Sequence, residues 1–343
     1  MNEPPSRLSA TAARGAVVAL IAVAIVSALA LSLLLIQVWL LIFAGLLLAV
    51  LLSSAADAVT RWTGSPRGVS LALVVLVLSL SVGAGTVALW PSISEQADEL
   101  TTRLPAAWSE LRGWIDDRPW GAWLVRRIEP GRVVSQQDMV HQATGALSST
   151  ATAIGGVVVM LFIGIYVAAE PSLYLCGMRR LLPQTAHGRY DTLTRELGGV
   201  LRWWLVGKLL SMTIVGVMTT LGLWLLNVPL ALAFGLIAAA LTFVPNIGPV
   251  LSVLPPALLA LTDEPRTAAY VVALYLAIQT VESYAITPII QRRTVSLPPA
   301  LTITAQVALG LLTGPLGVAV ATPLTAVAMT VVSVLYVEPQ EQT

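Results

Sequence analysis

The stretch FVPNIGPVLSVLPP, Phe243–Pro256, places four prolines, a glycine and an asparagine within an otherwise apolar part of the chain. Proline removes a backbone donor and breaks helices. An unpaired backbone group in hydrocarbon costs several kcal/mol, so irregular backbone at membrane depth is tolerated only beside protein or a water-filled cavity. The stretch therefore predicts a turn of the chain inside a membrane protein.

The composition supports this assignment to the membrane. Of the 343 residues, 57% are hydrophobic and 11% are charged, whereas a soluble domain carries about 25% charged residues. The long apolar runs cover residues 15–52, 68–90, 147–169, 203–226 and 267–288. A span needs about 20 apolar residues, so we predict an all-α polytopic transmembrane protein with about five to six full spans.

The placement of arginine predicts the orientation of these spans. The segments before the first run and after three later crossings hold Arg7, Arg14, Arg61, Arg67, Arg179, Arg180, Arg189, Arg195, Arg202, Arg292 and Arg293. The short loops on the other side carry only Arg266. The positive-inside rule then places the N-terminus and these segments in the cytoplasm, with the chain in the inner or plasma membrane.

This orientation requires residues 228–262 to begin and end outside. The segment consists of two short apolar stretches joined by a break, which predicts a re-entrant or barely spanning hairpin whose tip holds Pro245, Gly248 and Pro249. A second broken hairpin, residues 297–336, turns at Gly314 and Pro315. Two such units of opposite orientation either form an inverted repeat, which in transporters encloses a binding site, or are unrelated hairpins.

The chain divides into four predicted parts. Residues 1–90 hold the N-terminal spans, 91–146 an extramembrane amphipathic insert, 147–202 the fourth span with a cytoplasmic linker, and 203–343 a transport core with both hairpins. The insert packs on a partner subunit, lies on the membrane surface or caps its own protein. The insert and the small-residue helix faces favour a homo-oligomer.

Charged residues inside the predicted spans are the first candidates for a site. Only Lys208 and Glu282 lie well within them, and a charge at mid-bilayer costs about 2.5–3.5 kcal/mol on insertion scales. Their similar depths allow an ion pair between them, and the alternative is that Lys208 snorkels to the cytoplasmic interface. Glu282 is a candidate proton or ion site, and further candidate ligands for a substrate or ion are Gln279, Asn246 and Gln306.

Other classes of function lack their motifs. The sequence holds no GxxxxGK[ST] phosphate loop, and two histidines with one cysteine give no plausible zinc or haem constellation. We expect no catalytic residues, cofactor, metal or nucleic-acid partner. The expected partners are the lipid bilayer and a small solute or ion.

Three landmarks stand within residues 196–323: the PxIGP stretch at Pro245–Pro249, the segment Gln279–Glu282 with Pro288, and the run of Gly314, Pro315, Gly317 and Pro323. With these landmarks the chain resembles the autoinducer-2 exporter family of bacterial multi-pass permeases. The resemblance implies a secondary transporter that exports a small polar solute, with Glu282 as ion site and the first hairpin tip as gate or binding element. The alternatives are a monovalent cation/proton antiporter, served by the same carboxylate, and a non-transporting membrane scaffold.

Overall fold

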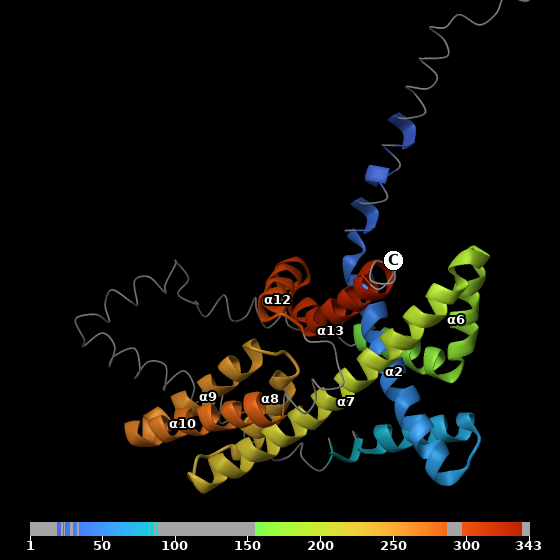
Figure 1. The fold of residues 1–343 in the computed structure, drawn as a ribbon. Helices are drawn as coiled ribbons and strands as arrows, with labels where there is room; N and C mark the ends of the chain where they lie inside the picture. Colours follow the sequence, from blue (N-terminus) through green and yellow to red (C-terminus); the bar gives the residue numbers. More distant parts are fainter. Residues whose placement is uncertain are drawn as a thin grey trace, which may run out of the picture.

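The computed structural model describes residues 34–81, 155–286 and 297–337, with scattered positions between 19 and 32 and between 83 and 87. Within these ranges every regular element is helical (Figure 1). The predicted insert, residues 91–146, and the segment that contains Pro288, Arg292 and Arg293 lie outside the described residues.

The first described group of helices precedes the core. It comprises α2 (Ile36–Thr63), the helix Arg67–Gly85, the helix Gly155–Ala169 and α6 (Pro171–Arg180). The last two are bent by 83° relative to each other. A short 3₁₀ turn, η1 (Gln184–Ala186), then leads into α7 (His187–Leu225), whose 39 residues run without a break from the arginine-rich segment into the core.

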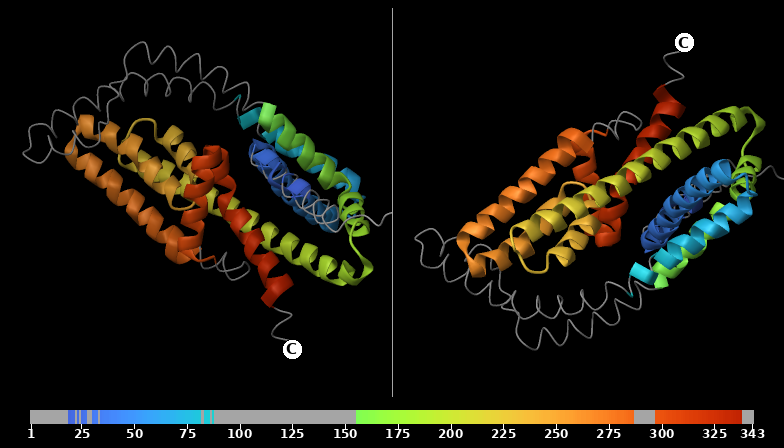
Figure 2. Two further views of the ribbon diagram at one scale, coloured as in Figure 1. Left: turned by 90° about the horizontal axis from the view of Figure 1, so that it is seen from above. Right: turned by 90° about the horizontal axis from the view of Figure 1, so that it is seen from below.

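The second group begins with α7 and contains both chain breaks. Its elements are α8 (Ala231–Thr242), α9 (Ile247–Asp263), α10 (Pro265–Val281), the π-helical turn η2 (Glu282–Ile286), α12 (Pro299–Thr313), α13 (Pro315–Val332) and the π-helical turn η3 (Ser333–Val337). Helices α7, α8, α9 and α10 lie side by side as a bundle, and α12 and α13 pack as a pair beside it (Figures 1 and 2).

The prediction of a polytopic helical membrane protein is confirmed. Among the described residues five helices are long and apolar enough to cross a membrane, or up to six if the bent pair at Ala169 and Pro171 is one span. Helices α8, α9 and α12, with 12, 17 and 15 residues, are shorter. The second hairpin is therefore unequal, because α13 with η3 has the length of a full span while α12 does not.

The first break lies slightly earlier than the sequence suggested. Helix α8 ends at Thr242 and α9 begins at Ile247, so Gly248 and Pro249 stand in the first turn of α9 rather than at the tip. A Cβ atom at Gly248 would lie 1.9 Å from the carbonyl oxygen of Leu241. Only glycine allows the two arms to approach so closely.

The second break lies where the sequence predicted it. Gly314 has a φ of 70° and a ψ of −149°, a backbone conformation that L side chains rarely adopt. Pro315 occupies the first position of α13, where its missing N–H costs no helical hydrogen bond. The Gly-Pro pair thus ends one helix and starts the next.

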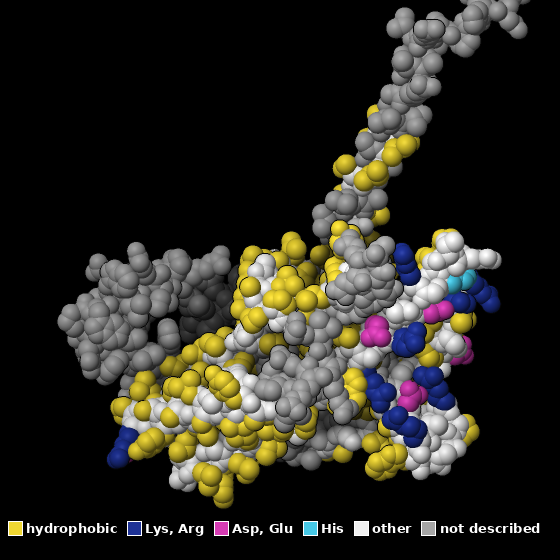
Figure 3. Space-filling model, viewed as in Figure 1, with side chains coloured by type: hydrophobic (Ala, Val, Ile, Leu, Met, Phe, Trp, Pro, Cys, Tyr) yellow, Lys and Arg dark blue, Asp and Glu magenta, His cyan; other side chains and the backbone are white. Residues whose placement is uncertain are grey.

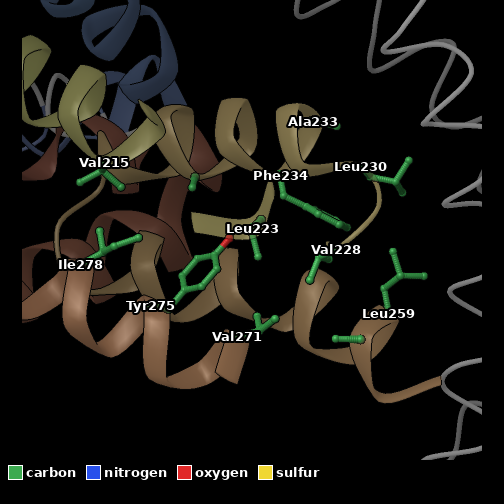
Figure 4. Close-up of a cluster of buried hydrophobic side chains, with 12 residues drawn as sticks. Val215, Leu223, Val228, Leu230, Ala233, Phe234, Leu259, Val271, Tyr275 and Ile278 are labelled. Atoms are coloured by element: carbon green, nitrogen blue, oxygen red, sulfur yellow. The ribbon is translucent and has the colours of Figure 1, made fainter. Parts of the chain in front are cut away.

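Two of the four clusters of buried side chains among the described residues involve α7. The larger cluster joins α7, α8, α9 and α10 and includes Leu223, Phe234, Leu259 and Val271 (Figure 4). A second cluster packs Leu47 of α2 against α7 at Leu201, Trp204 and Leu205. Helix α7 therefore connects the N-terminal helices with the broken hairpins.

Charged side chains gather at one end of the molecule. Figure 3 shows most of the basic and acidic side chains around α6, the start of α7 and the end of α2, whereas hydrophobic side chains predominate over α8, α9, α10 and α12. Arg179 and Asp191 form an exposed ion pair there, with Nε and Oδ1 3.0 Å apart. This distribution accords with the predicted cytoplasmic segment, and the orientation itself stays a prediction.

Candidate functional site

The candidate site lies between α7 and α10, which run antiparallel. Two contacts fix their register. Ser211 of α7 reaches Glu282 at the end of α10, and at the other end Gly222 faces Leu274, whose Cδ1 atom would lie 2.5 Å from a Cβ at Gly222. The lack of a side chain at Gly222 lets α10 pack closely against α7.

Lys208, Ser211 and Glu282 form a polar cluster where α7 packs against α10, a contact called the α7–α10 seam below. The Lys208 Nζ and Glu282 Oε1 atoms are 3.9 Å apart, and the two side chains are 12% and 10% exposed. The Ser211 hydroxyl donates a hydrogen bond of 2.5 Å to the same carboxylate oxygen. The expected ion pair is present, so the ammonium group of Lys208 is directed at a carboxylate instead of away from the core.

The backbone at Glu282 departs from regular α-helix. Helix α10 ends at Val281, and residues 282–286 continue as a π-helical turn. Such turns insert an extra residue and occur frequently at functional sites. The turn changes the direction of the side chains that follow, with Glu282 and Ile286 buried and Tyr284 exposed.

A second polar cluster joins the two broken hairpins. Gln306 of α12 is 1% exposed, and its Nε2 atom donates a hydrogen bond of 3.1 Å to the Pro245 carbonyl and lies 3.4 Å from the Thr322 hydroxyl. A carbonyl only accepts, so the nitrogen of the Gln306 amide must face Pro245. On the other side of the tip, Phe243 packs edge-on against Trp204 of α7, with ring centroids 5.8 Å apart.

Comparison with known proteins decides the family. The sequence model described as AI-2E family transporter matches residues 16–336, nearly the whole chain. The chain belongs to the AI-2E transporter family. The resemblance seen in the sequence is thereby confirmed.

Relatives of this AI-2E family member carry transport names. The "Putative transport protein YrrI" of Bacillus subtilis (strain 168) is 25% identical over 301 residues, covering 83% of this chain and 84% of the relative. The "Putative transport protein YhhT" of Escherichia coli (strain K12) is 26% identical, covering 83% and 82%. The "AI-2 transport protein TqsA" of Escherichia coli (strain K12) is 25% identical, covering 82% and 81%.

Two other candidate residues of this AI-2E protein, Gln279 and Asn246, lie outside the buried polar clusters. The Gln279 amide donates to the Ser283 hydroxyl at 3.2 Å on an exposed surface, so its side chain is engaged one turn along its own helix. Asn246 occupies the cap position of α9 with a φ of 67°, but its exposed side chain makes no capping hydrogen bond. Neither side chain is buried with the ion pair.

Sequence reasoning missed two residues that complete these clusters. Ser211 lies three residues after Lys208, which is the spacing of a shared helix face and could have pointed to it. Thr322 contacts Gln306 from the neighbouring helix, and no local pattern predicts that contact. In the described ranges no three His, Cys, Asp or Glu side chains lie together as a metal site would require.

Proposed function

We propose that this AI-2E family protein is a secondary transporter that exports a small polar solute, with Glu282 as the site that binds the coupling proton or ion. The observation that carries the proposal is the buried Lys208–Glu282–Ser211 cluster within candidate spans. Ionisable residues inside a membrane are costly and are functional by default. The name of the relative, AI-2 transport protein TqsA, makes AI-2 the first solute to test.

The geometry suggests how proton binding would act on the seam. An ionised Glu282 neutralises Lys208 and accepts the Ser211 hydrogen bond, and both contacts hold α10 against α7. Protonation of the carboxylate leaves the ammonium group of Lys208 without its counter-charge. An uncompensated buried charge is strongly unfavourable, so protonation would favour a state in which the seam opens.

The hairpin contact supports a role for the first tip as a gate. The tip is held between Trp204 of α7 and Gln306 of α12, by a ring contact and by one hydrogen bond to a backbone carbonyl. Broken helices in transporters expose such carbonyls to ions and substrates. Release of the Gln306 contact would free the carbonyl of Pro245 for a ligand.

The test is proton flux in proteoliposomes that enclose a pH-sensitive dye. Wild-type protein is compared with Glu282→Gln and with Glu264→Gln, an exposed carboxylate just before α10 that serves as control. Na⁺, K⁺ and candidate polar solutes are added in turn. Flux that requires one added solute, is lost in Glu282→Gln and is kept in Glu264→Gln supports the proposal.

Other outcomes discriminate among the alternatives. Flux driven by Na⁺ or K⁺ alone, and lost in Glu282→Gln, would identify the monovalent cation/proton antiporter instead. Equal flux from wild type and Glu282→Gln would remove Glu282 as the coupling site. Folded protein without flux under any condition would favour uncoupled export or a scaffold.

A further inference from the structure

Two buried hydroxyl groups of α7 and α10 have no hydrogen-bond partner within the part of the chain that the structure describes. The Thr219 Oγ1 and Tyr275 OH atoms are inaccessible to solvent and make no hydrogen bond among the described residues. Thr219 is fully buried and Tyr275 is 8% exposed. In a membrane interior, a buried polar group without a partner is costly, so two of them at one place call for an explanation.

The two hydroxyls lie at the same level of the seam. The Ser211–Glu282 and Gly222–Leu274 contacts fix the antiparallel register on both sides, and Thr219 falls level with Tyr275 between them. Thr219 shares its helix face with Val215 and Leu223, one turn away on either side. Both of these neighbours pack in the same buried cluster as Tyr275.

Tyr275 directs its hydroxyl into this cluster. Figure 4 shows the phenol oxygen pointing away from α10, in the direction of Leu223 of α7. A buried tyrosine hydroxyl normally finds a hydrogen-bond partner. The side chain therefore presents a polar atom to the face of α7 that carries Thr219.

Thr219 differs from most other threonines of the described helices. A helical threonine usually bonds the carbonyl four residues earlier. That bond is made by Thr63, Thr194, Thr213, Thr242, Thr280, Thr302, Thr313, Thr325 and Thr330. Thr219 makes no such bond, which leaves its hydroxyl available to a ligand in the seam.

We infer that Thr219 and Tyr275 form a subsite that binds one hydroxyl group, either that of a water molecule or that of a polar solute. Each side chain offers one donor and accepting lone pairs, so a single hydroxyl can bridge both. The subsite lies two turns from Glu282 on the same face of α10, about 10 Å along the helix axis. The subsite extends the Lys208–Ser211–Glu282 cluster along the seam. The inference depends on the two unpartnered hydroxyls and does not require that the protein transports a solute.

Thermal unfolding in nanodiscs tests the inference without any assay of transport. Thr219→Val and Tyr275→Phe each remove one hydroxyl and keep the shape of the side chain. Their matched controls are Thr213→Val on the exposed face of α7 and Tyr270→Phe on the exposed part of α10. The two variants and their double variant are measured in salt buffer alone, and again with small polyhydroxy solutes from glycerol to pentoses.

If one ligand bridges both hydroxyls, each single variant should have a lower unfolding midpoint than wild type. The midpoint of the double variant should then fall by less than the sum of the two single decreases. This coupling in salt buffer alone identifies water, and coupling that appears only with a polyhydroxy solute identifies the solute. A raised or unchanged midpoint for both single variants in every buffer would overturn the inference, since removing an orphaned hydroxyl stabilises. Thr219→Ser keeps the hydroxyl, and we expect it to keep the coupling with Tyr275→Phe.

Discussion

The side-chain amide of Gln306 donates a hydrogen bond to the main-chain carbonyl of Pro245, 3.1 Å away, and so ties the second broken hairpin to the tip of the first. The two residues stand 61 positions apart in the chain. Each was a candidate from the sequence, for different reasons. Their hydrogen bond joins the two broken hairpins at one polar contact.

We expect Gln306→Leu to loosen the first hairpin tip, because it leaves the half-buried Pro245 carbonyl without its donor, at a cost of about 0.5–1.5 kcal/mol. The measurement is the rate at which a maleimide labels Asn246→Cys in a Cys176→Ser background. The rate should rise in Gln306→Leu and stay constant in Gln279→Leu, whose amide bonds an exposed serine. An unchanged rate in Gln306→Leu would show that the bond does not hold the tip.

Gly248→Ala should destabilise the protein by about 1–3 kcal/mol or more, as overpacking does. The new Cβ would lie 1.9 Å from the Leu241 carbonyl oxygen, a backbone atom that cannot rotate aside. Gly199→Ala in α7 is the control, because a Cβ there meets no atom within 4 Å. That substitution should be neutral or stabilising, by about 0.5–1 kcal/mol, from helix propensity. A stable Gly248→Ala variant would mean that the arms separate readily.

The Lys208–Glu282 pair should show strong coupling in a double-mutant cycle. Lys208→Met and Glu282→Gln each remove one partner of a buried pair, which typically costs about 3–5 kcal/mol, whereas the double variant should lose less than the sum. Denaturant unfolding in detergent gives the four free energies. The exposed pair Arg179–Asp191, 44% and 47% exposed, is the control and should couple by less than about 1 kcal/mol. Additive losses at Lys208 and Glu282 would contradict the ion pair.

Cys176 reports the orientation of the chain. It is the only cysteine in the sequence and is exposed on α6, beside the arginine-rich start of α7. We expect a membrane-impermeant maleimide to label it in inside-out vesicles and not in intact cells, because the positive-inside rule places this segment in the cytoplasm. Cys176→Ser gives the background. Labelling in intact cells would reverse the predicted orientation.

Some predictions from the sequence stay predictions. Nothing in the structure tests the inverted repeat, the homo-oligomer or the side from which each hairpin enters the membrane. The export of a polar solute is likewise untested. The insert of residues 91–146 lies outside the described residues. Gln279 was a candidate ligand from the sequence, but its amide bonds Ser283 one turn along the same segment and does not join the buried cluster of Glu282.

From the amino-acid sequence alone came the helical, membrane-spanning fold and the breaks of the chain near Pro245 and at Gly314. The sequence also singled out Lys208 and Glu282 as the two charges within predicted spans. Hydrocarbon penalises polar groups so heavily that apolar length, proline and isolated charges are visible along a single chain. The helix packing brings Ser211 to Glu282 and Gln306 to Pro245, and neither pairing follows from any local sequence pattern. Those pairings depend on the register between apolar helices, which small and branched side chains set by close packing and which many similar sequences share.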